Sequence, residues 1–220
     1  LGVDVPALDG VAFIDPRNSE IDIVQAVGRA IRLSKGKAIG SIVIPVFIED
    51  HEDPDEVLNS SPFKKVWAVV NALRSHDEGL GEQLDQLRQS MGKRGTVGTS
   101  DKIIFDLPTT ITHKFESALN TKVIESTTAS WEFFYGLLSD YIEAKKHARV
   151  QAKEIFKDKH LGVWCDTQRL LYRQNKLPSF RIDALEKFFD KGWVWSLKDS
   201  QREENIKLLT DFRSEEHTSE

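Results

Sequence analysis

Two arginines and a glutamine recur along one stripe near the start of the chain. They are Gln25, Arg29 and Arg32, spaced i, i+4 and i+7 on a predicted helix, with Gly28 between them. Residues at these spacings share one helical face. A guanidinium keeps its charge and forks onto phosphate oxygens, so a pair one turn apart suits a γ-phosphate whose charge spreads over several oxygens during transfer. The stripe predicts the arginine-finger half of an ATP site.

The elements around this stripe follow from apolar patterning. Val24, Val27 and Ile31 form a separate apolar face of the same helix. The run 11–15 before the helix is typical of a strand, and the run 37–48 after it is typical of a strand buried on both faces of a parallel sheet. The alternative to a nucleotide site is a solvent-exposed helix with ordinary surface charges.

The segment Gly2-Val3-Asp4-Val5-Pro6, followed by Gln25-x-x-Gly28-Arg29-x-x-Arg32, resembles motifs V and VI of superfamily-2 helicases. Those motifs lie in the second RecA-like domain of that family. The resemblance implies that both arginines contact the γ-phosphate, that the glutamine organises the site, and that Asp4 contacts the ribose or couples ATP to nucleic acid. The residues so implicated are Gln25, Arg29 and Arg32 as catalytic, and Gly2, Asp4 and Gly28 as cofactor-binding.

The other half of an ATP site is missing from the sequence. It contains no G-x-x-x-x-G-K-[ST] loop and no D-E-x-x acid pair after a strand to hold magnesium. We therefore expect a fragment of a longer protein, inactive as an ATPase by itself, whose intact form has an N-terminal RecA-like domain and uses ATP and Mg²⁺. The tail 213–220 is identical to the translation of a common sequencing adapter, and we exclude it from fold reasoning.

Composition restricts the function only weakly. The formal net charge is −5, or −3 without the tail, which neither demands nor forbids nucleic acid. The acidic run that begins at Glu49 is expected to be a solvated loop, whereas the segment 142–181 is basic. No apolar run approaches the roughly 20 residues of a membrane span. The single cysteine, Cys165, is expected to pack in a core and fits a reducing compartment, and we expect a cytoplasmic protein.

The middle of the chain, 51–127, is predicted to be a mostly helical connecting region. Apolar stripes over 63–73 and 84–91 predict a helical hairpin interrupted at Gly79 and Gly81. The run 102–106 predicts a strand, and a helix carrying Ile111, Phe115, Ala118 and Leu119 is expected after it. His76 and His113 lack partners at metal-ligand spacing, so no metal site is predicted.

Three further helices are predicted between residues 128 and 197. The first has a broad apolar stripe from Trp131 to Ile142, and the second covers 161–173. The third begins after an N-cap at Ser179 and stops near Gly192. Together they predict a small three-helix bundle with a tryptophan-rich core.

This region resembles the helicase-associated domain. The resemblance is carried by Trp131/Leu138/Tyr141, by Leu161-Gly162-Val163-Trp164 with Gln168, Arg169 and Tyr172, by the step from Leu177 to Arg181, and by Gly192-Trp193-Val194-Trp195. Trp193 stands where phenylalanine is usual, and Gln151-Ala152 lacks the expected proline. The run 137–141 recurs in similar form at 208–212, so a second, truncated copy is expected over 198–212.

Basic residues in and around these helices predict a nucleic-acid surface. Cations could neutralise phosphates and exposed aromatic rings could stack on bases, although tryptophans at helical spacing are more often core. We expect nucleic acid as the partner, DNA in preference to RNA, and no membrane. The predicted contacts are Lys145, Lys146, Arg149, Lys153, Arg169, Arg173, Lys176 and Arg181.

The expected fold class is α/β plus all-α. The C-terminal part of a RecA-like parallel-sheet domain (1–50) precedes the mostly helical region and the three-helix helicase-associated bundle (128–197). The resemblances imply a piece of an ATP-dependent helicase or translocase. The alternative is a non-catalytic binding or interaction module with no ATPase activity of its own.

Overall fold

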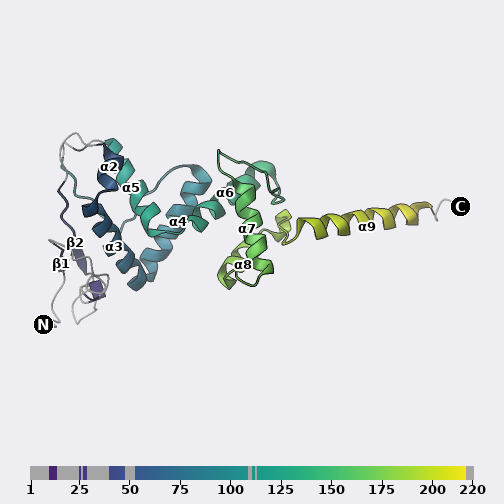
Figure 1. Ribbon diagram of the computed structural model, residues 1–220, viewed down its shortest axis with the longest axis horizontal. Coiled ribbons are helices and arrows are strands. Elements are labelled where there is room, and N and C mark those ends of the chain that lie inside the picture. Colours follow the sequence, from purple (N-terminus) through teal and green to yellow (C-terminus); the bar gives the residue numbers. More distant parts are fainter. Residues whose placement is uncertain are drawn as a thin grey trace. The chain divides into compact units, whose positions relative to one another are not determined.

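The computed structural model describes residues 10–13, 25, 27–28, 40–47, 53–108, 111 and 113–216, with side chains as far as residue 213. The chain divides into two compact units, Leu1–Phe133 and Phe134–Glu220. The described elements (Figure 1) are β1 Gly10–Ala12, β2 Ser41–Val43, α2 Pro54–Leu58, α3 Ser61–His76, α4 Glu78–Arg94, α5 His113–Thr127, α6 Ser130–Lys145, α7 Leu161–Arg173, α8 Ser179–Glu186, the 3₁₀ turn η1 Phe189–Lys191, and α9 Leu197–Glu216.

The two strands form a parallel pair. Gly10 lies opposite Ser41 and Ala12 opposite Val43. The backbone N–H of Phe13 extends the ladder by donating to the Val43 carbonyl at 2.9 Å. The predicted parallel pairing is therefore confirmed, with strands shorter than the apolar runs that indicated them.

The second strand is covered on one face, not on both as predicted. Ile42 and Ile44 pack with buried Val69 of α3, but Val43 is 58% exposed and Phe47 is 84% exposed. Successive side chains of a strand point to opposite faces, so α3 reaches only alternate residues. The prediction of a strand buried on both faces is wrong for the described part of the chain.

Helices α3 and α4 form the predicted hairpin, with Asp77 at the junction. The Asp77 carboxylate caps α4 by accepting from the Leu80 N–H at 3.0 Å and also binds Lys102 Nζ at 2.8 Å. The hydrogen bond from Lys102, followed by that from the Leu80 backbone, lowers the pKa of this carboxyl. Because α4 already begins at Glu78, Gly79 and Gly81 lie inside it, and the predicted break there is wrong.

The core of the first unit is built by α2, α3, α4 and α5. Its buried residues are Val57, Leu58, Phe63, Trp67, Val70, Leu80, Leu84, Met91, Phe115, Leu119, Val123 and Ile124. Figure 1 shows α3, α4 and α5 beside one another, in agreement with their mutual contacts. The apolar stripes predicted over 63–73 and 84–91 thus face one common core.

The run 102–106 is not a strand. Ile103 and Phe105 pack against the core of the first unit, whereas Ile104 is 87% exposed. The alternation that indicated a strand is present, but no strand among the described residues pairs with this segment. The run is therefore part of the irregular connection between α4 and α5.

In the second unit, α7 has the bounds predicted from the sequence. Helix α8 begins at Ser179 and has Pro178 at its N-cap position, so the predicted cap is displaced by one residue. Helix α8 ends at Glu186, before the stop predicted near Gly192. The separate 3₁₀ turn η1 is capped by Gly192, whose φ of 88° is in the left-handed region that glycine adopts readily. Helix α6 begins in the first unit and ends in the second.

Candidate nucleic-acid interface

Only part of the predicted phosphate-binding stripe lies among the described residues. Gly2, Asp4, Arg29 and Arg32 lie outside them. Gln25 is exposed, and no described heavy atom lies within 4 Å of where a Cβ on Gly28 would stand. Val27, from the predicted apolar face of the same helix, is fully buried with Val69 and Ala72 of α3. Val27 and Gln25 therefore have the burial that the predicted helix requires, with its apolar face covered and its glutamine exposed.

Aromatic side chains join α6 to α7 and to the region of α8. Phe134 stacks on Trp164 with ring centroids 5.7 Å apart. Tyr135 packs against Phe188, and its hydroxyl donates to the Ala184 carbonyl at 3.2 Å. The rings and this hydrogen bond fix how α7 and α8 lie against α6.

The residues predicted to face inward are buried or half-buried. The buried ones include Leu138 and Tyr141 from α6, and Leu161 and Cys165 from α7. Burial raises the pKa of the Cys165 thiol to about 12, so it stays neutral near pH 7. The packing role expected for this cysteine is confirmed.

Gly162 allows the segment before α7 to lie against the start of that helix. A Cβ at this position would stand 2.1 Å from the Gln151 carbonyl oxygen and 2.6 Å from that of Ala152. The Gly162 N–H donates to the Glu154 carbonyl at 2.9 Å. A residue with a side chain cannot occupy this position without moving the backbone of the preceding segment, which carries Lys153.

Arg169 is buried and does not belong to the predicted basic surface. It is 3% exposed, its Nε donates to the Val194 carbonyl at 3.1 Å, and its Nη1 donates to the Val150 carbonyl at 3.0 Å. Nη1 also contacts Asp166, and the guanidinium lies 4.8 Å from the centroid of the Trp193 ring. This arginine ties two connecting segments to α7, so its assignment as a surface contact is corrected to a structural one.

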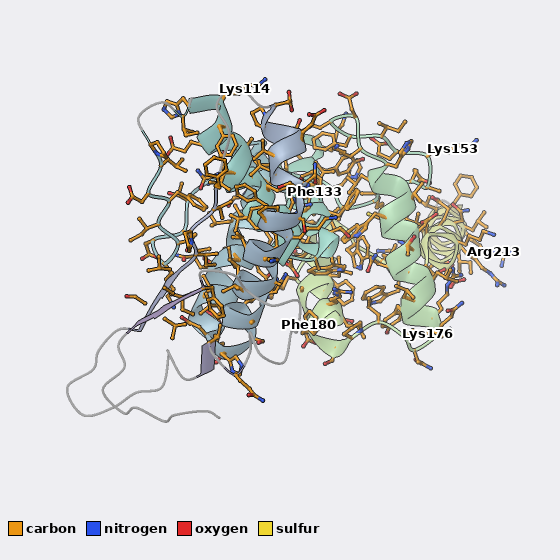
Figure 2. All side chains as sticks on the ribbon, turned by 60° about the vertical axis from the view of Figure 1, so that its left-hand side comes forward. Lys114, Phe133, Lys153, Lys176, Phe180 and Arg213 are labelled. Carbon is orange, nitrogen blue, oxygen red and sulfur yellow. The ribbon has the colours of Figure 1, made fainter. Side chains whose placement is uncertain are left out.

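The other seven predicted cations reach the surface to different degrees. Arg149 and Arg181 are half-buried, and Arg181 lies 5.5 Å from the centroid of the exposed Phe180 ring. The exposed cations are Lys145, Lys146, Lys153, Arg173 and Lys176. Figure 2 shows Lys153 and Lys176 at opposite ends of α7, so these two cations border that helix at its two ends and do not belong to one compact cluster.

Arg149 forms an ion pair with Glu204 that the sequence did not predict. Its Nη1 donates to Glu204 at 2.9 Å, its Nη2 also contacts that carboxylate, and Nη2 reaches the Ser200 hydroxyl at 3.4 Å. A second such pair joins Lys157 to Asp140 at 2.7 Å. Each pair joins a residue of the connection between α6 and α7 to a residue of a helix, and neither pair has a helical spacing that the sequence could reveal.

The tryptophans of the second unit mainly pack against other rings. Trp193 is 1% exposed, and Trp195 stacks on Tyr172 with centroids 4.0 Å apart. The exposed phenylalanine rings among the described residues of this unit are instead Phe180, Phe189 and Phe212, at 60%, 48% and 64%. The sequence left two roles open for these tryptophans, core packing and base stacking. Packing holds for Trp193, and the exposed rings that could stack on bases are phenylalanines.

Two other kinds of site were sought among the described residues. No group of three histidine, cysteine or acidic side chains in that part of the chain could hold a metal ion. None of the described helices is long and apolar enough to cross a membrane.

Comparison with known proteins identifies the segment that contains α6, α7 and α8. Residues 128–196 match the family model of the helicase associated domain. Among solved structures, the chain is similar to one described as the ATP-dependent Type ISP restriction-modification enzyme LlaBIII bound to DNA, at 22% sequence identity and a TM-score of 0.47. That likeness covers 90% of this chain and 16% of the other. No curated protein sequence matches. Residues 128–196 thus form a helicase-associated domain, the family whose model they match.

Proposed function

We propose that the intact protein is an ATP-dependent nucleic-acid helicase or translocase of the cytoplasm. The observation that carries the proposal is the match of residues 128–196 to the helicase associated domain. The Gln25-x-x-Gly28-Arg29-x-x-Arg32 run supports it from the other end of the chain. In this proposal residues 1–50 belong to a second RecA-like domain and 51–127 connect it to a three-helix helicase-associated bundle at 128–197.

In the proposed motor, ATP and Mg²⁺ bind between two RecA-like domains. Arg29 and Arg32 reach the γ-phosphate and stabilise the charge that develops on it during transfer, while Gln25 orders the site. Gly2, Asp4 and Gly28 lie close to the nucleotide. The exposure of Gln25 beside the buried Val27 supports a polar stripe free to face such a partner domain.

The helicase-associated domain grips the polymer in this proposal. Cations that border α7 contact phosphate oxygens, and this kind of contact carries no base specificity. The contacts we retain are Lys145, Lys146, Arg149, Lys153, Arg173, Lys176 and Arg181. DNA is the preferred polymer over RNA.

Helix α9 is proposed to begin a second copy of the same domain, over 198–212. Leu137, Leu138 and Tyr141 of α6 are at most 4% exposed. Their counterparts 71 residues later, Leu208, Leu209 and Phe212, are 64–70% exposed. The exposed residues support a helix whose own partner helices are not among the described residues.

Replacing Arg32 by alanine in the intact protein tests the motor. ATP turnover stimulated by single-stranded DNA should be abolished while ATP binding changes little, because an arginine finger acts mainly on the transition state. Arg32→Lys should also fail to restore turnover, since an ammonium lacks the forked geometry. Normal turnover in Arg32→Ala would refute the assignment, and an intact protein that binds DNA without hydrolysing ATP would support the non-catalytic binding module instead.

A further inference from the structure

A groove in the second unit lies between the segment 149–151 and the first turns of α9. Its volume is about 530 Å³. It is lined by Arg149, Gln151, Leu197, Lys198, Ser200, Gln201, Arg202, Asn205, Ile206 and Leu209. Three of these described lining residues are cationic and none is acidic.

The two cations of α9 that line the groove lie on one side of the helix, and its acidic residues as far as residue 213 lie on other sides. At about 100° per residue, Lys198 and Arg202 lie within one narrow sector, and Lys207 lies on the opposite side. The acidic residues of α9 as far as residue 213 are Asp199, Glu203, Glu204 and Asp211. None of them lines the groove, although Glu204 holds Arg149 at its edge. The groove therefore presents positive charge on a helix that carries its acids elsewhere.

The rest of the lining is apolar or carries amides. Ile206 is 53% exposed and Leu209 is 70% exposed. Gln201 and Asn205 lie between the cations and the apolar end, with the Gln201 amide donating to Asn205 Oδ1 at 3.3 Å. Cations beside an open apolar surface match a single-stranded nucleic acid, which offers a phosphate backbone and the flat faces of unpaired bases.

The similarity between the runs 137–141 and 208–212 argues against an apolar protein partner at this end of α9. With the same shift of 71 residues, Arg202 is the counterpart of Trp131, which is 6% exposed. In α9 the same position is occupied by an exposed arginine. A helix face made to be covered by apolar neighbours would leave the Arg202 charge desolvated without a partner, which is costly. The cations of the groove thus favour a charged polymer.

We infer that this groove binds the phosphodiester backbone of a single-stranded nucleic acid. Lys198 and Arg202 contact phosphates, and Ile206 lies against a base. The inference rests on the proposed nucleic-acid function and adds to it a binding track on α9, beyond the cations that border α7.

Fluorescence anisotropy of the full chain with fluorescein-labelled oligothymidylate and oligouridylate tests the inference. Each strand should be roughly 20 nucleotides, longer than one typical binding site. The variants are Lys198→Ala/Arg202→Ala and, as the matched control on the far side of the same helix, Lys207→Ala. Two lost phosphate contacts should make the slope of log K against log salt shallower by about 1.4 in the double variant. The control should keep the wild-type slope.

The outcomes separate this inference from the function on which it rests. If the wild-type chain binds and the double variant binds with the same affinity and slope, the groove is not a binding site, and the proposed nucleic-acid function stands. Equal losses of affinity in the double variant and in Lys207→Ala would also refute binding in the groove, because they would indicate that binding depends on the total charge of α9 and not on the cations of the groove. If the wild-type chain binds neither strand at low salt, the proposed nucleic-acid function fails together with the groove. The two strands distinguish DNA from RNA as the source of the backbone.

Discussion

Gly162→Ala should unfold or severely destabilise the second unit. The added Cβ would overlap two backbone carbonyl oxygens, at 2.1 and 2.6 Å, and no rotation of a flexible side chain can relieve such contacts. We expect a loss of about 3 kcal/mol or more in the free energy of unfolding, at or above the upper end for overpacked sites. Urea denaturation followed by circular dichroism measures the loss, and hydrogen exchange in α7 locates it.

Gly81→Ala is the matched control for this variant. Gly81 also lies in a helix, but its added Cβ would come no closer than 3.5 Å to a described atom outside its own turn, the Cγ of Arg74. Relieving the conformational entropy cost of glycine should stabilise α4 by about 0.5–1 kcal/mol. If Gly162→Ala were as stable as the wild type, the close approach of residues 151–152 to α7 would be wrong.

Arg169→Ala should destabilise the same unit through a different cause. The substitution removes the donors to the Val150 and Val194 carbonyls and the ring contact with Trp193. Leaving buried acceptors unpaired costs about 1–3 kcal/mol each, so we expect a loss of about 2–4 kcal/mol. Chemical denaturation at neutral pH measures this loss.

Arg173→Ala distinguishes a structural arginine from a surface one. It lies one turn further along α7 and is exposed. We expect unchanged stability, together with a nucleic-acid affinity that is lower and less dependent on salt. Full stability in Arg169→Ala, or a large loss of stability in Arg173→Ala, would contradict the roles given to these two residues.

Helical periodicity predicted the faces of the helices better than the contacts between segments. The stripe that begins at Trp131 placed Leu138 and Tyr141 correctly inside, and the bounds of α7 agree with the prediction. Arg169 was predicted to be a surface contact because its position in the sequence alone says nothing of its partners. Those partners are carbonyls 19 and 25 residues away in the sequence, and only the folded chain brings them to the guanidinium.

The errors in the first unit have a related origin. Alternating apolar residues over 102–106 are compatible with a strand, yet a strand also needs a partner for its backbone groups. Gly79 and Gly81 indicated a break, but the Asp77 cap and the packing of Leu80 and Leu84 sustain the helix through them. In both places tertiary context overrides the local signal. Of the candidate ATP site, Arg29 and Arg32 remain predictions from sequence.

Binding of single-stranded DNA to the wild-type chain as a function of salt tests the central claim most directly. The claim is that the helicase-associated domain and its flanking helix contact a nucleic-acid backbone through exposed cations. The account predicts measurable affinity at low salt and a linear fall of log K with log salt, with a slope of about −0.7 for each phosphate contacted. Absence of binding at low salt, or an affinity that does not change with salt, would contradict it.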